Sequence, residues 1–251
     1  MDSIIENNLN LFTPISLDEL TNYRLQNRID TKYICNTRQI PLILEKVSTY
    51  FKVQETDNKR IFKYESLYFD TPGLKSYFDH HQGKRVRYKV RFRKYIETGD
   101  TFLEIKKKEN YIRTNKKRKE FDFSDNLNQE HLDYIDRIFT IPEEGLQANL
   151  WTIFNRITLA GKNHIERVTI DTGIKFKDDM QEVGLDDLSI IEVKCERTGC
   201  ISPFTRVLKE LHIRPMGMSK YILGNILLKL EIKHNRFSQR VAIIKKICYD
   251  T

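Results

Sequence analysis

Hydrophobic and polar side chains alternate along several segments of the chain, which predicts β-strands. The clearest segment is VRYKVRFRKY (86–95), where apolar residues at even numbers alternate with bases at odd numbers from 86 to 93. Successive side chains of a strand point to opposite faces, so this segment would carry one apolar face and one face of four cations. Like charges on one face repel, and this face therefore needs an anionic partner.

The same alternation predicts further strands, and a period near 3.6 predicts helices between them. The further predicted strands are 28–35, 63–70, 101–109, 112–123, 151–159, 164–171 and 188–196. The predicted helices are 40–47, 74–81, 127–139, 203–211 and 220–230. Turn sequences join neighbouring strands into hairpins, which favours an antiparallel α+β fold over a doubly wound sheet. Without repeats or a Pro/Gly/Ser-rich linker, we expect one domain over 1–251, with its core at about 20–230.

Long Arg, Lys and Glu side chains recur on the polar face of at least five predicted strands. Two arrangements fit this pattern: an open sheet with a solvated charged face, or a closed barrel with helices outside and charges inside. An eight-stranded barrel has room for one small ligand. Buried cations without anions cost several kcal/mol each. A charged interior would therefore be wet, partly paired with Glu, and suited to a triphosphate with a divalent ion.

The composition narrows the class of protein and of partner. Fourteen Phe and twelve Tyr argue against disorder even though charged residues reach 31%. The net charge of +8 favours an anionic partner: nucleic acid, a phosphorylated small molecule or an acidic membrane surface. RNA binders usually interleave exposed aromatics with bases, whereas Tyr88 and Phe92 fall opposite the cations, which counts against a nucleic acid polymer.

Sequence features also bear on location. The four cysteines have no CxxC spacing, which indicates reduced thiols in a cytoplasmic protein. The first residues lack the basic and apolar regions of a secretory signal, and no window approaches about 20 apolar residues. We therefore expect a cytoplasmic protein that reaches a membrane only peripherally, through a partner.

Eight short motifs occur in an order that resembles VTC domains. They are TKY (31–33), YFDT (68–71), VRFR (90–93), LEIK (103–106), FNR (154–156), ERVTID (166–171), IIEVK (190–194) and MSKY (218–221). VTC domains are the polyphosphate polymerase domains of the vacuolar transporter chaperone complex and their bacterial relatives, and the resemblance covers roughly residues 20–225. They belong to the CYTH, or triphosphate tunnel metalloenzyme, superfamily. The resemblance thus implies a closed, antiparallel eight-stranded β tunnel with helices packed outside.

The resemblance also implies a reaction and a set of site residues. The reaction is transfer of the γ-phosphoryl group of ATP to a growing polyphosphate chain, with Mn²⁺ or Mg²⁺ as cofactor. The implied catalytic bases are Arg91, Arg93, Lys106, Arg156, Arg167 and Lys220. The implied additional phosphate ligands are Lys32, Lys89, Lys116, Arg118 and Lys194, and the register of the basic run 116–119 is left open. Glu192 is the implied metal ligand and Glu104 a second candidate. The superfamily often begins with an ExExK strand, but Arg28 stands at its first acidic position here, which leaves fewer carboxylates for metal.

Other functions remain open at this point. Water could replace polyphosphate as the acceptor, which would make the protein a tunnel triphosphatase or polyphosphatase. A non-catalytic module that binds polyphosphate or a nucleotide is a further alternative. The expected partners are ATP and polyphosphate, and a separate membrane protein is a candidate partner. The sequence leaves polymer length, metal preference and oligomeric state open.

Overall fold

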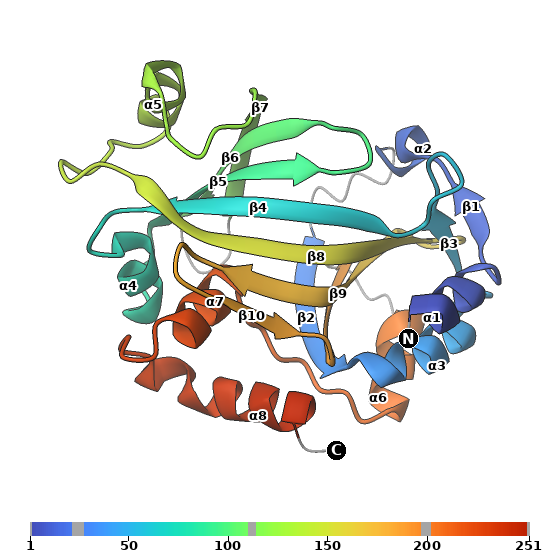
Figure 1. Ribbon diagram of the computed structural model, residues 1–251. Coiled ribbons are helices and arrows are strands. Elements are labelled where there is room, and N and C mark those ends of the chain that lie inside the picture. The colour runs from blue at the N-terminus through green and yellow to red at the C-terminus, as the bar shows by residue number, and fades with distance from the viewer. Residues whose placement is uncertain (1, 22–27, 110–113, 197–201, 250–251) are drawn as a thin grey trace.

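One large sheet organises the computed structural model, which describes residues 2–21, 28–109, 114–196 and 202–249 (Figure 1). Its eight main strands are antiparallel, in the order β2–β11–β9–β8–β4–β5–β6–β7. Their bounds are β2 (Arg28–Asn36), β11 (Leu188–Glu196), β9 (Glu166–Lys177), β8 (Gln147–Gly161), β4 (Phe62–Asp70), β5 (Arg87–Tyr95), β6 (Thr101–Lys108) and β7 (Thr114–Glu120). Short strands extend the sheet at its sides: β3 (Phe51–Gln54) pairs with β8, β1 (Thr13–Ile15) pairs with β3, and β10 (Glu182–Leu185) pairs with β9. The mixed α+β class and the antiparallel sheet are as predicted.

The helices include each of those that the sequence predicts. They are α1 (Asp2–Leu9), α2 (Leu17–Thr21), α3 (Ile40–Val47), α4 (Lys75–His81), α5 (Gln129–Asp136), α6 (Pro203–Glu210), α7 (Lys220–Leu228) and α8 (Ser238–Tyr249). Capping residues place two of their starts. Asn128 accepts a hydrogen bond from the backbone N–H of His131 (3.0 Å) before α5, and Ser202 accepts one from Thr205 (3.0 Å) before α6. Helices α1, α2 and α8 were not predicted.

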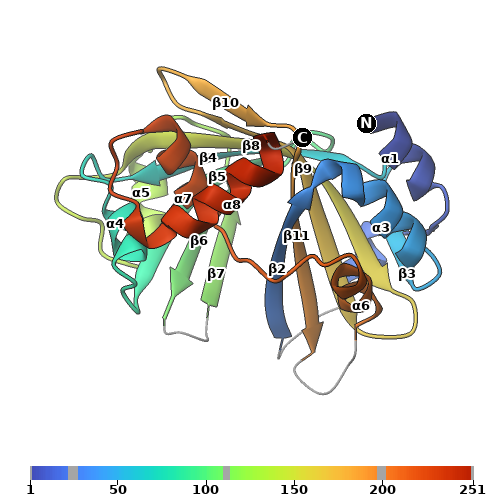
Figure 2. The same cartoon turned by 90° about the horizontal axis from the view of Figure 1, so that it is seen from below.

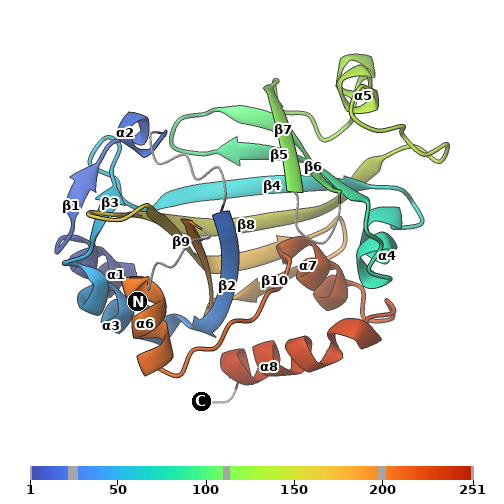
Figure 3. The same cartoon turned by 180° about the vertical axis from the view of Figure 1, so that it is seen from behind.

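The predicted closure of the sheet into a tunnel is not found. Among the described residues, β2 pairs with β11 and β7 pairs with β6, but no pairing joins β2 to β7 (Figures 2 and 3). The segment between α6 and α7 instead lies along the edge of β2. The backbone N–H of Met216 donates to the carbonyl of Lys32 (2.8 Å), and Pro215 bridges to Tyr33. Part of the β2 edge is thus already paired, and the sheet stays open.

Four helices cover the outer face of the sheet, which is the face opposite the charged side chains, as predicted. Helices α1, α3 and α6 pack on the half formed by β2, β11, β9 and β8, where Ile43 and Phe204 share a buried cluster with Val193. Helix α5 covers the other half, where Ile135 packs against Phe92. These apolar contacts use the side of each strand that faces away from its charged residues.

Helix α7 lies on the inner face instead, which corrects the expectation that all helices pack outside. Its Tyr221 and Ile222 share a buried cluster with Ile190, which lies on the same side of β11 as Glu192. Gly224 permits the close approach, because a Cβ there would lie 2.7 Å from a ring carbon of Phe176. Helix α8 joins the same cluster and contacts the end of β2 (Figure 2). Apolar side chains therefore fill part of the inner face.

Candidate functional site

The strand register gathers the predicted phosphate-binding bases on the inner side of the sheet. Lys89, Lys106 and Lys116 lie directly opposite one another across β5, β6 and β7, and Arg91, Glu104 and Arg118 form the next row. Directly opposite residues share one face of a sheet. We call the full set the inner cationic face; it comprises Lys32, Lys89, Arg91, Arg93, Lys106, Lys116, Arg118, Arg156, Arg167, Lys194 and Lys220.

Glu104 holds three of these bases together. Its carboxylate lies 2.6 Å from Arg91, 2.5 Å from Lys116 and 3.8 Å from Arg93, and only 1% of the side chain is exposed. Although burial acts in the opposite direction, Arg91, Arg93 and Lys116 lower the pKa of Glu104 well below its usual value. Glu104 was a candidate metal ligand; the structure shows it paired with bases.

Asp171 holds a second group of bases that come from distant parts of the chain. Arg156 donates to both of its carboxylate oxygens, at 2.6 and 2.8 Å, and Lys220 at the start of α7 contacts the same carboxylate. Against the effect of burial, these two cations lower the pKa of Asp171 far below its usual value. Asp171 was not among the site residues predicted from the sequence. Its position on the same strand face as Arg167 was the available signal.

Glu192 is the third shared carboxylate and the predicted metal ligand. It contacts Lys32 and lies 3.2 Å from Lys194. In the part of the chain that the structure describes, no group of three His, Cys, Asp or Glu residues could hold a metal ion. Mg²⁺, however, is usually held by one or two carboxylates together with substrate phosphates and water. Glu192 fits that mode of binding together with Asp30, which lies on the neighbouring strand two residues from Lys32, the residue directly opposite Glu192.

Cations from the two sides of the open sheet lie close enough to lower the pKa values of one another's side chains. Burial, followed by Lys220 and Lys106, lowers the pKa of Lys32 to about 7. Burial and Arg91 lower the pKa of Lys106 to about 8, and Lys194 adds to this effect. Cations from β2, β6, β11 and α7 are thus crowded together, and an anion among them would relieve their repulsion.

The remaining predicted bases lie as follows. Arg167 is directly opposite Lys194 in the register. Lys89 lies beside the start of α7, where it donates to the hydroxyl of Ser219 at 2.7 Å. Burial, then repulsion by Lys106, lowers its pKa well below the usual value. The structure also resolves the register of the run 116–119: Lys116 and Arg118 face inward, whereas Lys119 pairs with Glu130 of α5 on the outer side.

Two tyrosines of β4 also belong to the site, although neither was among the site residues predicted from the sequence. The hydroxyl of Tyr68 accepts a hydrogen bond from Arg91 at 2.6 Å. The ring of Tyr64 lies under two guanidinium groups, with its centre 5.4 Å from Arg93 and 5.0 Å from Arg156. The polar Ser66 between them marks this strand face as inward, a signal that was present in the sequence.

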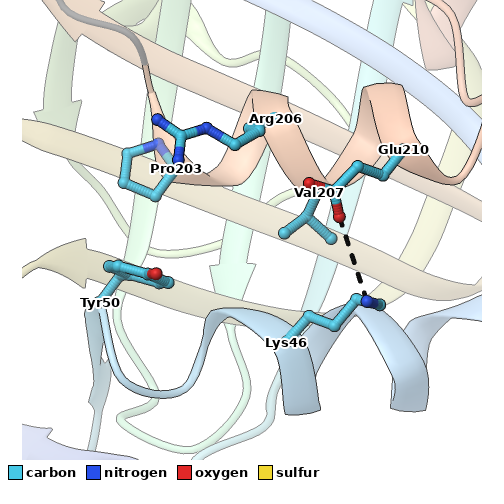
Figure 4. Close-up of a pocket in the computed structure, with 6 residues that line it drawn as sticks. All are labelled: Lys46, Tyr50, Pro203, Arg206, Val207 and Glu210. Atoms are coloured by element: carbon cyan, nitrogen blue, oxygen red, sulfur yellow. Dashed lines mark ion pairs between the residues drawn. The ribbon is translucent and has the colours of Figure 1, made fainter.

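A small cavity of about 170 Å³ lies elsewhere, between α3 and α6 on the outer side of the sheet (Figure 4). Its lining carries both signs of charge, and Lys46 and Glu210 lie 4.0 Å apart across it. It is lined by Lys46, Tyr50, Pro203, Arg206, Val207 and Glu210. The inner cationic face is therefore the better candidate for binding a polyanion.

Comparisons with known proteins bear on the family and the fold of this chain. The family model of the VTC domain matches residues 27–229. A candidate adenylate cyclase from Bacillus halodurans shares the fold at 11% identity, with a TM-score of 0.50 over 77% of this chain and 94% of that one. HpAC1 from Hippeastrum, a candidate adenylyl cyclase described with a dominant triphosphatase activity, matches at 14% identity and a TM-score of 0.49 over 82% and 100%. No curated protein matches the chain. Within the described ranges, no helix is long and apolar enough to cross a membrane.

Proposed function

Because this chain belongs to the VTC domain family, we propose that it is a polyphosphate polymerase. It would transfer the γ-phosphoryl group of ATP to the end of a growing polyphosphate chain on the inner cationic face. One observation carries the proposal: bases from seven strands and one helix converge there around only a few shared carboxylates. Such an excess of positive charge is suited to a ligand with several negative charges.

Phosphoryl transfer needs mainly positioning and charge stabilisation from the protein. Arg91 and Arg156 are the fixed cations of the site. Although burial opposes it, Tyr68 and Glu104 raise the pKa of Arg91, and Asp171 raises that of Arg156. A guanidinium held in this way can present its remaining N–H groups to phosphate oxygens in a defined orientation. The acceptor is a terminal phosphate oxygen that is already ionised at neutral pH, so no strong general base is required.

The residues of the site fit a divalent metal that binds together with the substrate. Glu192 and Asp30 would hold it together with phosphate oxygens, and when bound it would neutralise negative charge on the transferred group. Because Lys32 and Lys194 form ion pairs with Glu192 in the free protein, these side chains would turn from the carboxylate to the phosphates as the substrate binds.

Hydrolysis is the second candidate function, and one observation favours it. Apolar side chains around α7, including Phe154 and Phe176, fill part of the inner face, which leaves less of that face for a long polyanion. A short site of this kind suits a triphosphatase, in which water is the acceptor. A separate membrane protein as a partner remains a prediction from the sequence.

The test is to incubate the purified protein with ATP and Mn²⁺ and to separate the products on a gel. Long polyphosphate supports the polymerase, free orthophosphate alone supports the hydrolase, and neither product indicates a binding module. We expect Glu192→Gln to abolish turnover while ATP binding persists. Glu182→Gln, on the exposed edge strand β10, is the matched control. Undiminished turnover of the Glu192 variant would refute its metal role.

A further inference from the structure

A row of aromatic rings crosses the inner face next to the bases. The rings of Phe154 and Tyr64 stack with centres 5.5 Å apart, Tyr64 lies 4.9 Å from Tyr95, and Tyr95 meets Phe102 edge-on at 5.8 Å. The row thus runs from β8 through β4 and β5 to β6. It ends at Phe102, which is only partly buried, and the guanidinium of Arg118 on β7 lies 4.6 Å from the centre of that ring.

The exposed end of this row is next to the phosphate-binding bases. Phe102 is directly opposite Arg93 in the register, and it is two residues from Glu104 on the same strand face. Arg118 is directly opposite Glu104. Residues that face each other across antiparallel strands have Cβ atoms about 5 Å apart. The Phe102 ring is therefore close enough for a single ligand to reach both it and Arg93.

The two ends of the row differ in what surrounds them. Cations lie over the rings at both ends, but the inner ring is buried: Phe154, whose centre is 5.1 Å from Arg156 and 4.2 Å from Lys220, is only 2% exposed. At the outer end, Phe102 keeps part of its surface accessible, and its cation, Arg118, is exposed. An accessible aromatic ring beside an exposed guanidinium is a combination on which nucleic acid bases stack.

We propose that Phe102 and Arg118 form a stacking shelf for the base of a nucleoside triphosphate whose phosphates lie on the inner cationic face. This inference rests on the proposed function, in which ATP is the donor. It assigns Arg118 to the base, where the sequence analysis expected a phosphate ligand. Stacking uses the π-face that every base has, so ATP and GTP are expected to bind alike.

The experiment compares two ligands that share phosphates but differ in the base. Binding of ATP and of inorganic tripolyphosphate is measured by calorimetry with EDTA present, so that no turnover occurs. We expect Phe102→Ala to weaken ATP binding by about fivefold or more, the lower limit for stacking of a base on an aromatic ring, and to leave tripolyphosphate binding unchanged. Phe102→Trp should retain the affinity for ATP, and GTP should follow ATP in each variant.

Two further variants keep the result interpretable. Phe102→Leu preserves apolar volume without a π-face, and it should show the same ATP-specific loss even if the alanine variant is poorly folded. Tyr50→Ala removes an exposed ring on the outer side of the sheet and should change neither affinity. Equal losses for both ligands, or no loss for ATP, would overturn the shelf alone. A wild-type protein that binds neither ligand would overturn the proposed function and the shelf with it.

Discussion

Binding of a triphosphate should be accompanied by uptake of protons. In the free protein, burial and neighbouring cations lower the pKa of Lys32 to about 7, even though Glu192 is in contact with it. Burial, opposed by Asp171 and reinforced by Arg156, lowers the pKa of Lys220 to about 8. A bound polyanion would return both values towards about 10.4, the ordinary value for lysine.

The size of the effect follows from these two values. At pH 8 a group with a pKa of about 7 is about one-tenth protonated, and one with a pKa of about 8 is half protonated. Full protonation in the complex would therefore take up about 1.4 protons at pH 8 and close to none at pH 6. Lys106 and Lys116, which are more exposed, act in the same direction.

The sign of the pH dependence is fixed by the direction of the shifts. Lysines whose pKa is low in the free protein and higher in the complex favour binding below their free pKa. From Lys32 and Lys220 alone, affinity should fall by about 20-fold as the pH rises from 6 to 8. The terminal phosphate of ATP, with a pKa of about 6, is already ionised at pH 8 and adds little to the uptake there.

The assay is calorimetric titration of ATP with EDTA at pH 8, in two buffers of different ionisation enthalpy. The difference in apparent binding enthalpy gives the number of protons taken up. The Lys32→Arg variant keeps the charge but does not titrate, so its uptake should be lower by about one proton. A binding enthalpy independent of the buffer, or equal uptake by the variant, would refute the reasoning.

Three further predictions concern stability. Glu104→Gln leaves Arg91 and Lys116 without their shared carboxylate and should lower the free energy of unfolding by about 3 kcal/mol or more, measured by denaturant unfolding. Tripolyphosphate should restore part of this loss. An unchanged unfolding midpoint would contradict the role of Glu104. Gly224→Val forces α7 away from the sheet and should lower the free energy of unfolding by about 1–3 kcal/mol and reduce ligand affinity. A melting temperature equal to that of the wild type would show that the helix can shift freely. Glu166→Gln, under α6 beside Ser202, should lower the unfolding free energy by about 1 kcal/mol or more while ATP affinity stays the same; a loss confined to binding would rule out this structural role.

The faces of individual strands could be predicted from the sequence. In residues 86–95, Val90 and Phe92 are buried against α5, while Arg91 and Arg93 lie on the opposite face beside Glu104, as the alternation indicated. The period of two is a local property of the extended backbone, so it can be recognised without knowing what the strand pairs with. The resemblance to VTC domains added Arg156 and Lys220, both of which lie on the inner face.

The partners of these residues could not be predicted in the same way. Asp171 contacts Arg156 because the pairing of β8 and β9 places the two residues directly opposite each other. It contacts Lys220 because α7 packs on the inner face. Tyr68 binds Arg91 for a similar reason, across β4 and β5. Register between strands depends on contacts over long sequence separations, which the pattern within one segment does not contain.

The sequence by itself determined which residues point to the same side of each strand, that one face of the strands would be rich in cations, and the family to which the chain belongs. Tertiary structure decided that the sheet stays open and that α7 lies inside it. Helix α7 is apolar around almost its whole circumference, which predicts burial but not the layer in which it is buried. Closure likewise depends on whether two edge strands meet, and the pairing of Lys32 with Met216 at the edge of β2 is a contact between segments far apart in the chain.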